Sequence, residues 1–195
     1  MISGNGGNNH GKWDERFRGK EFTLGTAPSP YLAENIEFVK SLVAGGKALD
    51  IACGEGRNSI FLAREGFDVT GLDISDAGLE KASKWMESEK LHIDFRIRNL
   101  EGYEFTETYD LIINFNFLLR DLIPKEVAAL RPGGVIVFDS ILDSPFVPTT
   151  HRKEFLLRPG ELYSIFSAFT GEIFFPEERL HDPLPTAKLI FQKSG

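Results

Sequence analysis

The sequence predicts an α/β fold in which an open, mostly parallel sheet carries helices on both faces and ends in a C-terminal antiparallel hairpin. Short apolar runs alternate with amphipathic stretches between residues 29 and 140, which is typical of parallel strands joined by crossover helices. A glycine-punctuated turn follows the first apolar run. The last two apolar runs have no room for a helix between them, so we expect them to pair antiparallel.

The length and composition favour one domain. A chain of 195 residues with 42% hydrophobic residues is long enough for one sizeable core and short for two. Residues 1–12 are rich in Gly and Asn and hold little to bury, so we expect them to be disordered. Residues 13–195 are then expected to form a single domain.

The first helix is expected to begin at Ser29 and Pro30, because Ser suits a helix cap and Pro suits the first helical position. Gly45 and Gly46 should end it. The apolar patterns that follow predict helices over 58–65 and 75–89, and strands over 47–52, 67–73, 93–97, 111–115 and 135–138. The C-terminal part predicts a helix around 162–169 and strands over 172–175 and 187–192.

Charge and cysteine content exclude several function classes. The net charge is −7 with a pI of about 5.2, and the Lys and Arg residues are scattered, which argues against a nucleic-acid partner. Cys53 is the single cysteine, so no internal disulfide is possible and a reducing, cytoplasmic location is expected. No apolar run reaches the roughly 18 residues of a membrane helix, and no signal peptide is recognisable. The His and acidic residues show no metal-site spacing.

The turn after the first strand is the strongest candidate for a ligand site. Asp50 lies near the end of a buried strand, and Gly54 and Gly56 follow it. Glycines let the backbone approach a ligand without a Cβ atom in between. Ligands of open α/β sheets bind outside the carboxyl ends of the strands. We therefore expect a small ligand at this turn.

Asp73 is the second candidate, because it ends the next predicted strand 19 residues after Gly54. A spacing of roughly 20 residues is typical of a carboxylate that binds ribose hydroxyls. The alternative role, capping the following helix, suits Ser75 and Asp76 better. The two sites together predict an adenosine-containing cofactor.

Two such cofactors compete at this point. A nicotinamide dinucleotide site usually has a third glycine, where this chain has Ser59 or its polar neighbours. The Asp50 carboxylate would oppose a pyrophosphate and suits a ligand with an ammonium and a sulfonium. The sequence thus favours S-adenosylmethionine. A nicotinamide-dependent oxidoreductase and a non-catalytic S-adenosylmethionine-binding protein remain alternatives.

Four segments resemble the motifs of class I S-adenosylmethionine-dependent methyltransferases, in their usual order. These are DIACGEG (50–56), LDIS (72–75), YDLIIN (109–114) and LRPGG (130–134). The resemblance implies a Rossmann-like fold and methyl transfer to an acceptor. It assigns cofactor binding to Asp50, Gly54, Gly56, Arg57, Asn58, Asp73, Ile74, Asn99, Leu100 and Asn114. Asn99 stands where the family often has an acidic residue at the adenine edge.

A narrower resemblance links the chain to the tellurite-resistance and thiopurine-type methyltransferases. It rests on WDERF (13–17), LGTAP (24–28), GEGRNS (54–59) and RPGEL (158–162). It implies that residues 13–45 form an N-terminal lid and helix, with Trp13, Arg16 and Gly25 as lid or substrate residues. Residues 46–140 would be the cofactor-binding core, and residues 141–195 the C-terminal helix and hairpin.

The same resemblance implies a small-molecule acceptor, a thiol or a chalcogen compound. The tellurite branch carries a Leu-His-Arg motif near its end, where this chain reads Leu180-His181-Asp182. His181 is therefore a candidate for a catalytic residue, and the Arg of that motif is absent.

Overall fold

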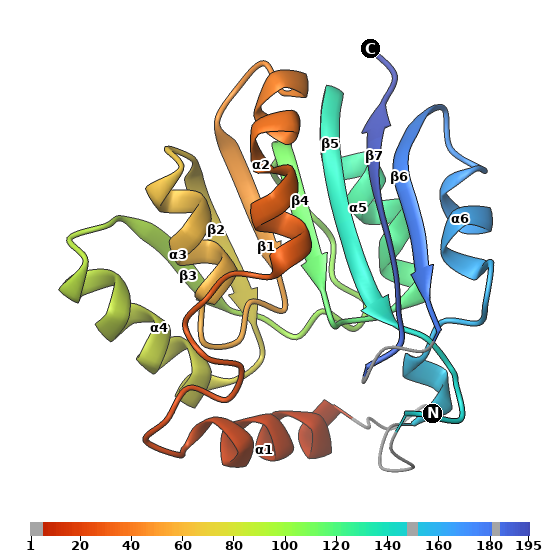
Figure 1. The fold of residues 1–195 in the computed structure, drawn as a ribbon. Helices are drawn as coiled ribbons and strands as arrows, with labels where there is room; N and C mark the ends of the chain where they lie inside the picture. The colour runs from red at the N-terminus through yellow and green to blue at the C-terminus, as the bar shows by residue number, and fades with distance from the viewer. Residues whose placement is uncertain (1–5, 148–151, 181–183) are drawn as a thin grey trace.

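The computed structural model describes residues 6–147, 152–180 and 184–195. Its centre is a seven-stranded sheet with the order β3-β2-β1-β4-β5-β7-β6 (Figure 1). The strands are β1 (Lys47–Ile51), β2 (Asp68–Asp73), β3 (Ile93–Ile97), β4 (Tyr109–Phe115), β5 (Leu130–Ile141), β6 (Gly171–Arg179) and β7 (Thr186–Lys193). Strands β1 to β5 pair in parallel, and β7 pairs antiparallel with β5 and β6. The predicted fold class is confirmed.

Helices cover both faces of the sheet. Figure 1 shows α2 (Pro30–Leu42) and α3 (Arg57–Arg64) in front of the sheet and α5 (Ile123–Ala129) behind it. The apolar side of α4 (Asp76–Ser88) joins the core of α2 and α3, and α6 (Glu161–Phe166) joins the core of α5. Short 3₁₀ turns lie over Arg120–Leu122 and Lys153–Phe155. The short helix α5 is absent from the sequence prediction.

The sheet is buried on both faces at its centre. All residues of β4 are buried, as its unbroken apolar run predicts. Alternate side chains enter different cores: Ile112 and Ile136 pack toward α5 and α6, whereas Ile113 and Val137 pack toward α2 and α3. The face to which a strand residue points therefore follows from its position in the register.

The fifth strand begins earlier than predicted. The Pro132-Gly133-Gly134 segment lies inside β5, which starts at Leu130, and the pairing with β4 shifts register between Tyr109 and Leu111. Gly133 has φ +75°, so the glycine turn is accommodated as an irregularity within the strand.

The N-terminal segment differs from the prediction. Residues 6–12 were expected to be disordered, and they form the first turns of helix α1 (Gly6–Phe17). The reason is docking rather than helix propensity, because Asp14 and Phe17 of the last turns are buried and His10 bonds Asp76. Figure 1 shows α1 beyond the carboxyl ends of the parallel strands, next to α4. Among the described residues, no helix combines the length and apolarity that crossing a bilayer requires.

Candidate functional site

The candidate site lies where the strand order reverses. Strand β1 has β2 on one side and β4 on the other, so the connections after β1 and after β4 leave the sheet in opposite directions. Open α/β sheets bind their ligands in the crevice at such a point, outside the carboxyl ends of the strands. The turn formed by Cys53 to Gly56 stands directly at this place, between β1 and α3.

Asp73 ends β2 and faces this turn. Its Oδ2 accepts a hydrogen bond from the Gly54 amide at 2.7 Å, and its Oδ1 accepts one from the Ser75 amide at 2.8 Å. Burial raises the pKa of Asp73, and the amides of Ser75, Gly54 and Ile74 oppose that rise. A carboxylate offers about four acceptor positions, more than these amides fill, so this arrangement leaves acceptor capacity for ligand hydroxyls.

Asp50 lies under the same turn and is 2% exposed. Its Oδ2 accepts a hydrogen bond from the Ser59 hydroxyl at 2.6 Å. Burial, with a contribution from nearby Asp73, raises the pKa of Asp50 to about 7. Ser59, which stands where a dinucleotide site has its third glycine, thus holds the Asp50 carboxylate close to the site. An anionic pyrophosphate would be disfavoured there.

The residues of the turn adopt the conformation that glycine favours. Gly54 and Gly56 have φ values of +55° and +82°, and Ala52 has +53°. A Cβ atom on Gly56 would lie 2.8 Å from the Cβ of Ala82 in α4. Gly56 is therefore required for close packing of the turn against α4, while Gly54 donates its amide to Asp73.

Arg57 and Asn58, predicted to bind the cofactor, contact the segment before α2. An Arg57 guanidinium nitrogen donates to the Leu24 carbonyl at 3.3 Å. The Asn58 Oδ1 accepts the Ser29 amide at 2.8 Å in a buried hydrogen bond. Both side chains therefore anchor the N-terminal segment to the turn.

Glu55 has the same role and was missed at the sequence level. It is 7% exposed, its Oε2 accepts the Thr23 amide at 2.7 Å, and its Oε1 pairs with Lys81 of α4 at 2.6 Å. The Lys81 ammonium also donates to the Glu21 carbonyl at 2.8 Å. An acidic residue between two glycines, with a Lys in the second helix that follows, is too common a pattern to reveal this contact.

Helix α1 docks through Asp14 and Phe17, which the sequence reading did not single out. Asp14 bonds the N-terminus of α4, accepting from the Ser75 hydroxyl at 2.6 Å and the Ala77 amide at 3.1 Å. The Phe17 ring packs against Gly54, where an added Cβ would lie 3.2 Å from it. Asp14 and Phe17 are three residues apart and lie on one helical face. This spacing is the sequence pattern that could have predicted the docking of α1.

Trp13, Arg16 and Gly25, the predicted lid residues, lie in this segment. Trp13 is 37% exposed and stacks on Phe17 with ring centroids 5.7 Å apart. The Arg16 guanidinium lies over the Trp13 ring at 5.0 Å. Gly25 is exposed with φ +70° and closes a turn on the Phe22 carbonyl. Their contact with a substrate remains a prediction.

The remaining predicted cofactor residues are distributed around the site. Ile74 is half-buried next to Asp73. Asn99 is exposed after β3, and its Oδ1 accepts the Glu101 amide at 3.0 Å. Leu100 is 5% exposed and belongs to the core on the α5 side. Their contact with a cofactor also remains a prediction.

Asn114 points away from the glycine turn. Its register position places the side chain on the α5 face, where its amide donates to Glu126 at 3.0 Å. Burial raises the pKa of Glu126 to about 8. The Asn114 Oδ1 and the Glu126 Oε2 are buried without a hydrogen bond from any described residue.

Two further features lie outside this arrangement. His181 falls outside the described residues. The His10 ring and the carboxylates of Asp14 and Asp76 bring ligand atoms within 4.8 Å of one another, but His10 pairs with Asp76 at 2.8 Å and Asp14 accepts bonds from α4. These contacts account for the cluster without a metal ion.

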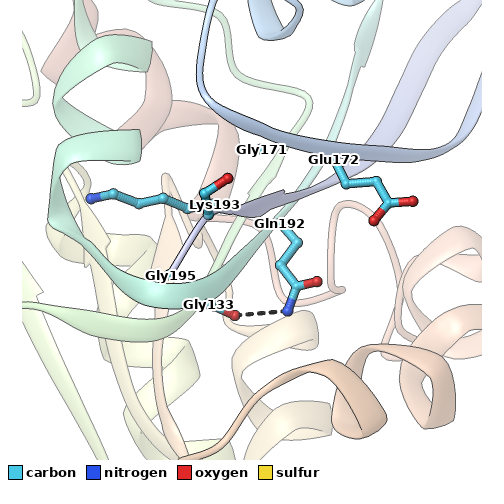
Figure 2. A pocket seen from close by; sticks show the side chains of 7 residues that line it. Gly133, Gly171, Glu172, Gln192, Lys193 and Gly195 are labelled. Atoms are coloured by element: carbon cyan, nitrogen blue, oxygen red, sulfur yellow. Dashed lines mark hydrogen bonds between the residues drawn. The ribbon is translucent and has the colours of Figure 1, made fainter.

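A surface hollow of about 530 Å³ lies at the opposite edge of the sheet (Figure 2). It is lined by Gly133, Gly171, Glu172 and the C-terminal residues from Gln192. The Gln192 side chain donates to the Gly133 carbonyl at 3.1 Å, and Lys193 donates to the Leu130 carbonyl at 2.8 Å. These residues lie at the amino end of β5, far along the strand from its carboxyl end, so the hollow is not the candidate site.

Comparison with known proteins agrees with the geometry. The family model described as tellurite resistance protein TehB matches residues 15–174. The probable S-adenosyl-L-methionine-dependent methyltransferase TehB of Haemophilus influenzae is 27% identical over 128 residues, covering 62% of this chain and 45% of that protein. A ubiquinone biosynthesis O-methyltransferase of Actinobacillus pleuropneumoniae is 34% identical over 145 residues, covering 60% of this chain and 62% of that protein.

Solved structures share the fold. The crystal structure of TehB from Haemophilus influenzae superposes with a TM-score of 0.69 at 23% identity, covering 83% of this chain and 62% of that one. The N-methyltransferase NodS from Bradyrhizobium japonicum, solved with S-adenosyl-L-homocysteine, gives a TM-score of 0.72 at 18% identity and covers 96% of this chain and 100% of that one. The chain spans about half the length of the curated TehB relatives it matches. Because the family model covers most of the chain, the protein belongs to the TehB family.

Proposed function

We propose that the chain is an S-adenosylmethionine-dependent methyltransferase that acts on a small molecule. The observation that carries the proposal is the pair formed by Asp73 at the end of β2 and Gly54 in the turn after β1, joined at 2.7 Å at the switch point of the sheet. Membership of the TehB family supports the same function.

The residues at the switch point fit the cofactor's chemical groups. The remaining acceptor capacity of the Asp73 carboxylate suits ribose hydroxyls. The absence of a side chain at Gly54 leaves room there for the Phe17 ring of the N-terminal segment. Asp50 supplies negative charge below the turn, which suits the ammonium and sulfonium of S-adenosylmethionine. When bound, that cofactor supplies an activated methyl group, and the protein contributes alignment and exclusion of water.

The N-terminal segment is proposed to act as the lid of this site. Bonds from Glu55, Arg57 and Asn58 hold it against the glycine turn, and Phe17 covers Gly54. Deleting residues 1–27 is expected to lower the methylation rate at least tenfold while the remaining sheet stays folded, as measured by circular dichroism. Full activity of the shortened chain would overturn the lid.

The acceptor is proposed to be a thiol or a chalcogen compound, handled in the reducing environment of the cytoplasm. The narrower resemblance to the tellurite-resistance and thiopurine-type group favours these acceptors. The acidic net charge of −7 supports a small molecule over a nucleic acid.

A ligand panel tests the cofactor. Thermal unfolding is measured with S-adenosylmethionine, S-adenosylhomocysteine, NAD and NADP. A ligand at about 100 times its dissociation constant stabilises the folded state by about 2.7 kcal/mol, which raises the melting point by several degrees. We expect a shift with the two adenosyl-sulfur ligands alone. A shift only with a nicotinamide cofactor would instead indicate an oxidoreductase.

Methyl transfer is tested separately, by the release of S-adenosylhomocysteine with thiols and with selenium and tellurium oxyanions as acceptors. Turnover with any of them distinguishes the enzyme from a protein that only binds S-adenosylmethionine. In this assay Asp68→Asn, at the exposed residue at the other end of β2, is the matched control for substitution of Asp73.

A further inference from the structure

A further buried carboxylate, besides those of Asp50 and Asp73, lies near the candidate site and has no role in cofactor binding as proposed. Asp139 lies near the carboxyl end of β5 and pairs in register with Phe115, the last residue of β4. The register of β1, β4 and β5 aligns Asp50 with Ile113 and Ile113 with Val137. Asp139 therefore shares the sheet face of Asp50, one strand beyond β4 and two residues closer to the carboxyl edge.

The main chain around Asp139 is fixed. The Asn116 amide donates to the Asp139 carbonyl at 2.8 Å, and Asn116 is an exposed residue with φ +57°. The turn after β4 is thereby tied to β5 at the open edge of the sheet. A ligand lying across the ends of β4 and β5 would meet Asp139 from this edge.

Charged groups from three other elements face this carboxylate. Lys188 of β7 pairs with Asp139 in register and is 9% exposed. Its ammonium lies 3.8 Å from Glu177 of β6 and 5.3 Å from the Tyr31 ring of α2. The Arg57 guanidinium, at the start of α3, interacts electrostatically with both Asp139 and Asp50. Arg57 thus connects the glycine turn to this cluster.

One oxygen of the carboxylate has no partner. The Oδ1 atom of Asp139 is buried and accepts no hydrogen bond from the residues that the structure describes. The residue as a whole is 9% exposed. A buried acceptor without a donor is unfavourable, because it has lost its hydrogen bonds to water. Such an atom is complementary to a ligand that brings a hydrogen-bond donor.

We propose, on the basis of the proposed methyl transfer, that Asp139 Oδ1 accepts the proton of a neutral thiol acceptor bound across the ends of β4 and β5. The S–H proton moves to Asp139, and the sulfur lone pair forms a bond to the transferred methyl carbon. The bond between that carbon and the sulfonium sulfur breaks, and its electron pair stays on S-adenosylhomocysteine. The products are a methyl thioether and S-adenosylhomocysteine, and Asp139 returns its proton to water.

The acid strength of the groups favours a thiol over other protic acceptors. Burial raises the pKa of Asp139 to about 6, opposed by Lys188, so the carboxylate is ionised at neutral pH and is a stronger base than an ordinary Asp. A thiol has a pKa of about 8.5, and a phenol has one of about 10. The thiol is the closer match, and proton transfer is most effective between groups of similar pKa.

The test compares the wild type with Asp139→Asn on two probe thiols. The neutral thiol is 2-mercaptoethanol, and the thiol already ionised at neutral pH is 4-nitrothiophenol. With 2-mercaptoethanol at pH 7, the variant is expected to be at least 100-fold slower, because general-base catalysis contributes about 10²–10⁴. With 4-nitrothiophenol it is expected to match the wild type within threefold. The rate of the variant with 2-mercaptoethanol should recover as the pH approaches the thiol's own pKa.

Two measurements separate this role from a structural one. S-adenosylhomocysteine affinity should be unchanged in Asp139→Asn and the melting point should not fall, because the variant removes a buried ionisable group. Asp143→Asn, at a partly exposed position beyond β5, serves as the control. In the wild-type complex with S-adenosylhomocysteine, the ¹³C carboxyl signal of Asp139 should titrate near pH 6. A titration near the ordinary Asp value of about 3.9 would overturn the proposal.

Three other outcomes distinguish failure of the Asp139 role from failure of the thiol acceptor and of the proposed function. Equal rates of Asp139→Asn and wild type with 2-mercaptoethanol overturn the role of Asp139 alone. A wild type that binds S-adenosylmethionine and methylates neither thiol overturns the thiol acceptor and leaves the proposed function standing. A wild type that does not bind S-adenosylmethionine overturns the proposed function itself.

Discussion

Asp14 in helix α1 accepts a hydrogen bond from the Ser75 hydroxyl at 2.6 Å, and the same oxygen accepts the Ala77 amide at 3.1 Å. Ser75 is itself the N-cap of α4 and accepts the Gly78 amide at 3.1 Å. The first turn of α4 is therefore capped twice, once by its own sequence and once by a residue about 60 positions away. Negative charge at a helix N-terminus is favourable, so the cap is also the docking contact of α1.

Asp14→Ala is expected to release α1. A hydrogen bond to a charged group contributes about 1.5–3 kcal/mol, so the free energy of unfolding should fall by about that amount. Hydrogen exchange of the α1 amides should accelerate in the same variant. Glu15→Ala, at the exposed neighbouring position, is the control, and equal effects of the two substitutions would contradict the cap.

The sequence predicted those parts of the fold that depend on local requirements, such as burial of a strand or capping of a helix. Apolar runs predicted the strands and the start of α2, and the Ser75 cap predicted the start of α4, because burial and capping act within a few residues. The end of α2 was predicted at Gly45 and Gly46, but the helix ends at Leu42, and Ser29 makes no side-chain cap bond. The contacts of Glu55 and Asp14 could not be predicted, since each depends on a segment that returns from far away in the chain. Asn58 shows the same limit, because its side-chain Oδ1 accepts a hydrogen bond from the Ser29 main-chain amide. The motif alone does not indicate this contact.

Asp73→Ala is expected to weaken binding of S-adenosylhomocysteine at least tenfold, because two charge-assisted bonds to ribose hydroxyls are lost. Isothermal titration calorimetry measures this. The substitution also removes the acceptor of the Gly54 amide, so the isosteric Asp73→Asn is measured beside it. Unchanged affinity in both variants, with Asp68→Asn as the control, would place the ribose elsewhere.

The glycine turn predicts opposite outcomes for two small substitutions. Ala52 has φ +53°, a conformation unfavourable by about 1–2 kcal/mol for a residue with a Cβ atom. The Ala52→Gly change relieves that strain and adds about 0.4–1 kcal/mol of unfolded-state entropy, so the melting point should stay the same or rise.

Gly56→Ala should instead destabilise the protein by more than 2 kcal/mol. Its new Cβ would lie 2.8 Å from the Cβ of Ala82, at φ +82°. Overpacking and a positive φ act in the same direction. Urea denaturation measures both variants, and a Gly56→Ala protein as stable as Ala52→Gly would show that α4 can move away from the turn.

The buried pair of Asn114 and Glu126 predicts how stability depends on pH. Burial raises the pKa of Glu126 to about 8 in the folded state, against about 4.3 when unfolded. Between these values the folded state holds a proton that the unfolded state releases, so the free energy of unfolding falls as pH rises, by up to about 1.4 kcal/mol per pH unit. Asp50 and Asp139, whose pKa values are raised to about 7 and about 6, act in the same direction over a narrower range.

Glu126→Gln removes the Glu126 contribution without changing the shape of the side chain. Its carbonyl can accept from Asn114 as Glu126 Oε1 does at 3.0 Å, and its amide can donate to the unpartnered Asn114 Oδ1. The variant should therefore be more stable than the wild type by at least about 1 kcal/mol at pH 8.5, and similar to it at pH 5. Urea denaturation of the ligand-free protein at both pH values measures this, with Glu80→Gln on the exposed face of α4 as the control. Equal pH slopes in wild type and Glu126→Gln would mean that Glu126 is ionised in the folded protein and finds a partner for its Oε2 that compensates for its burial.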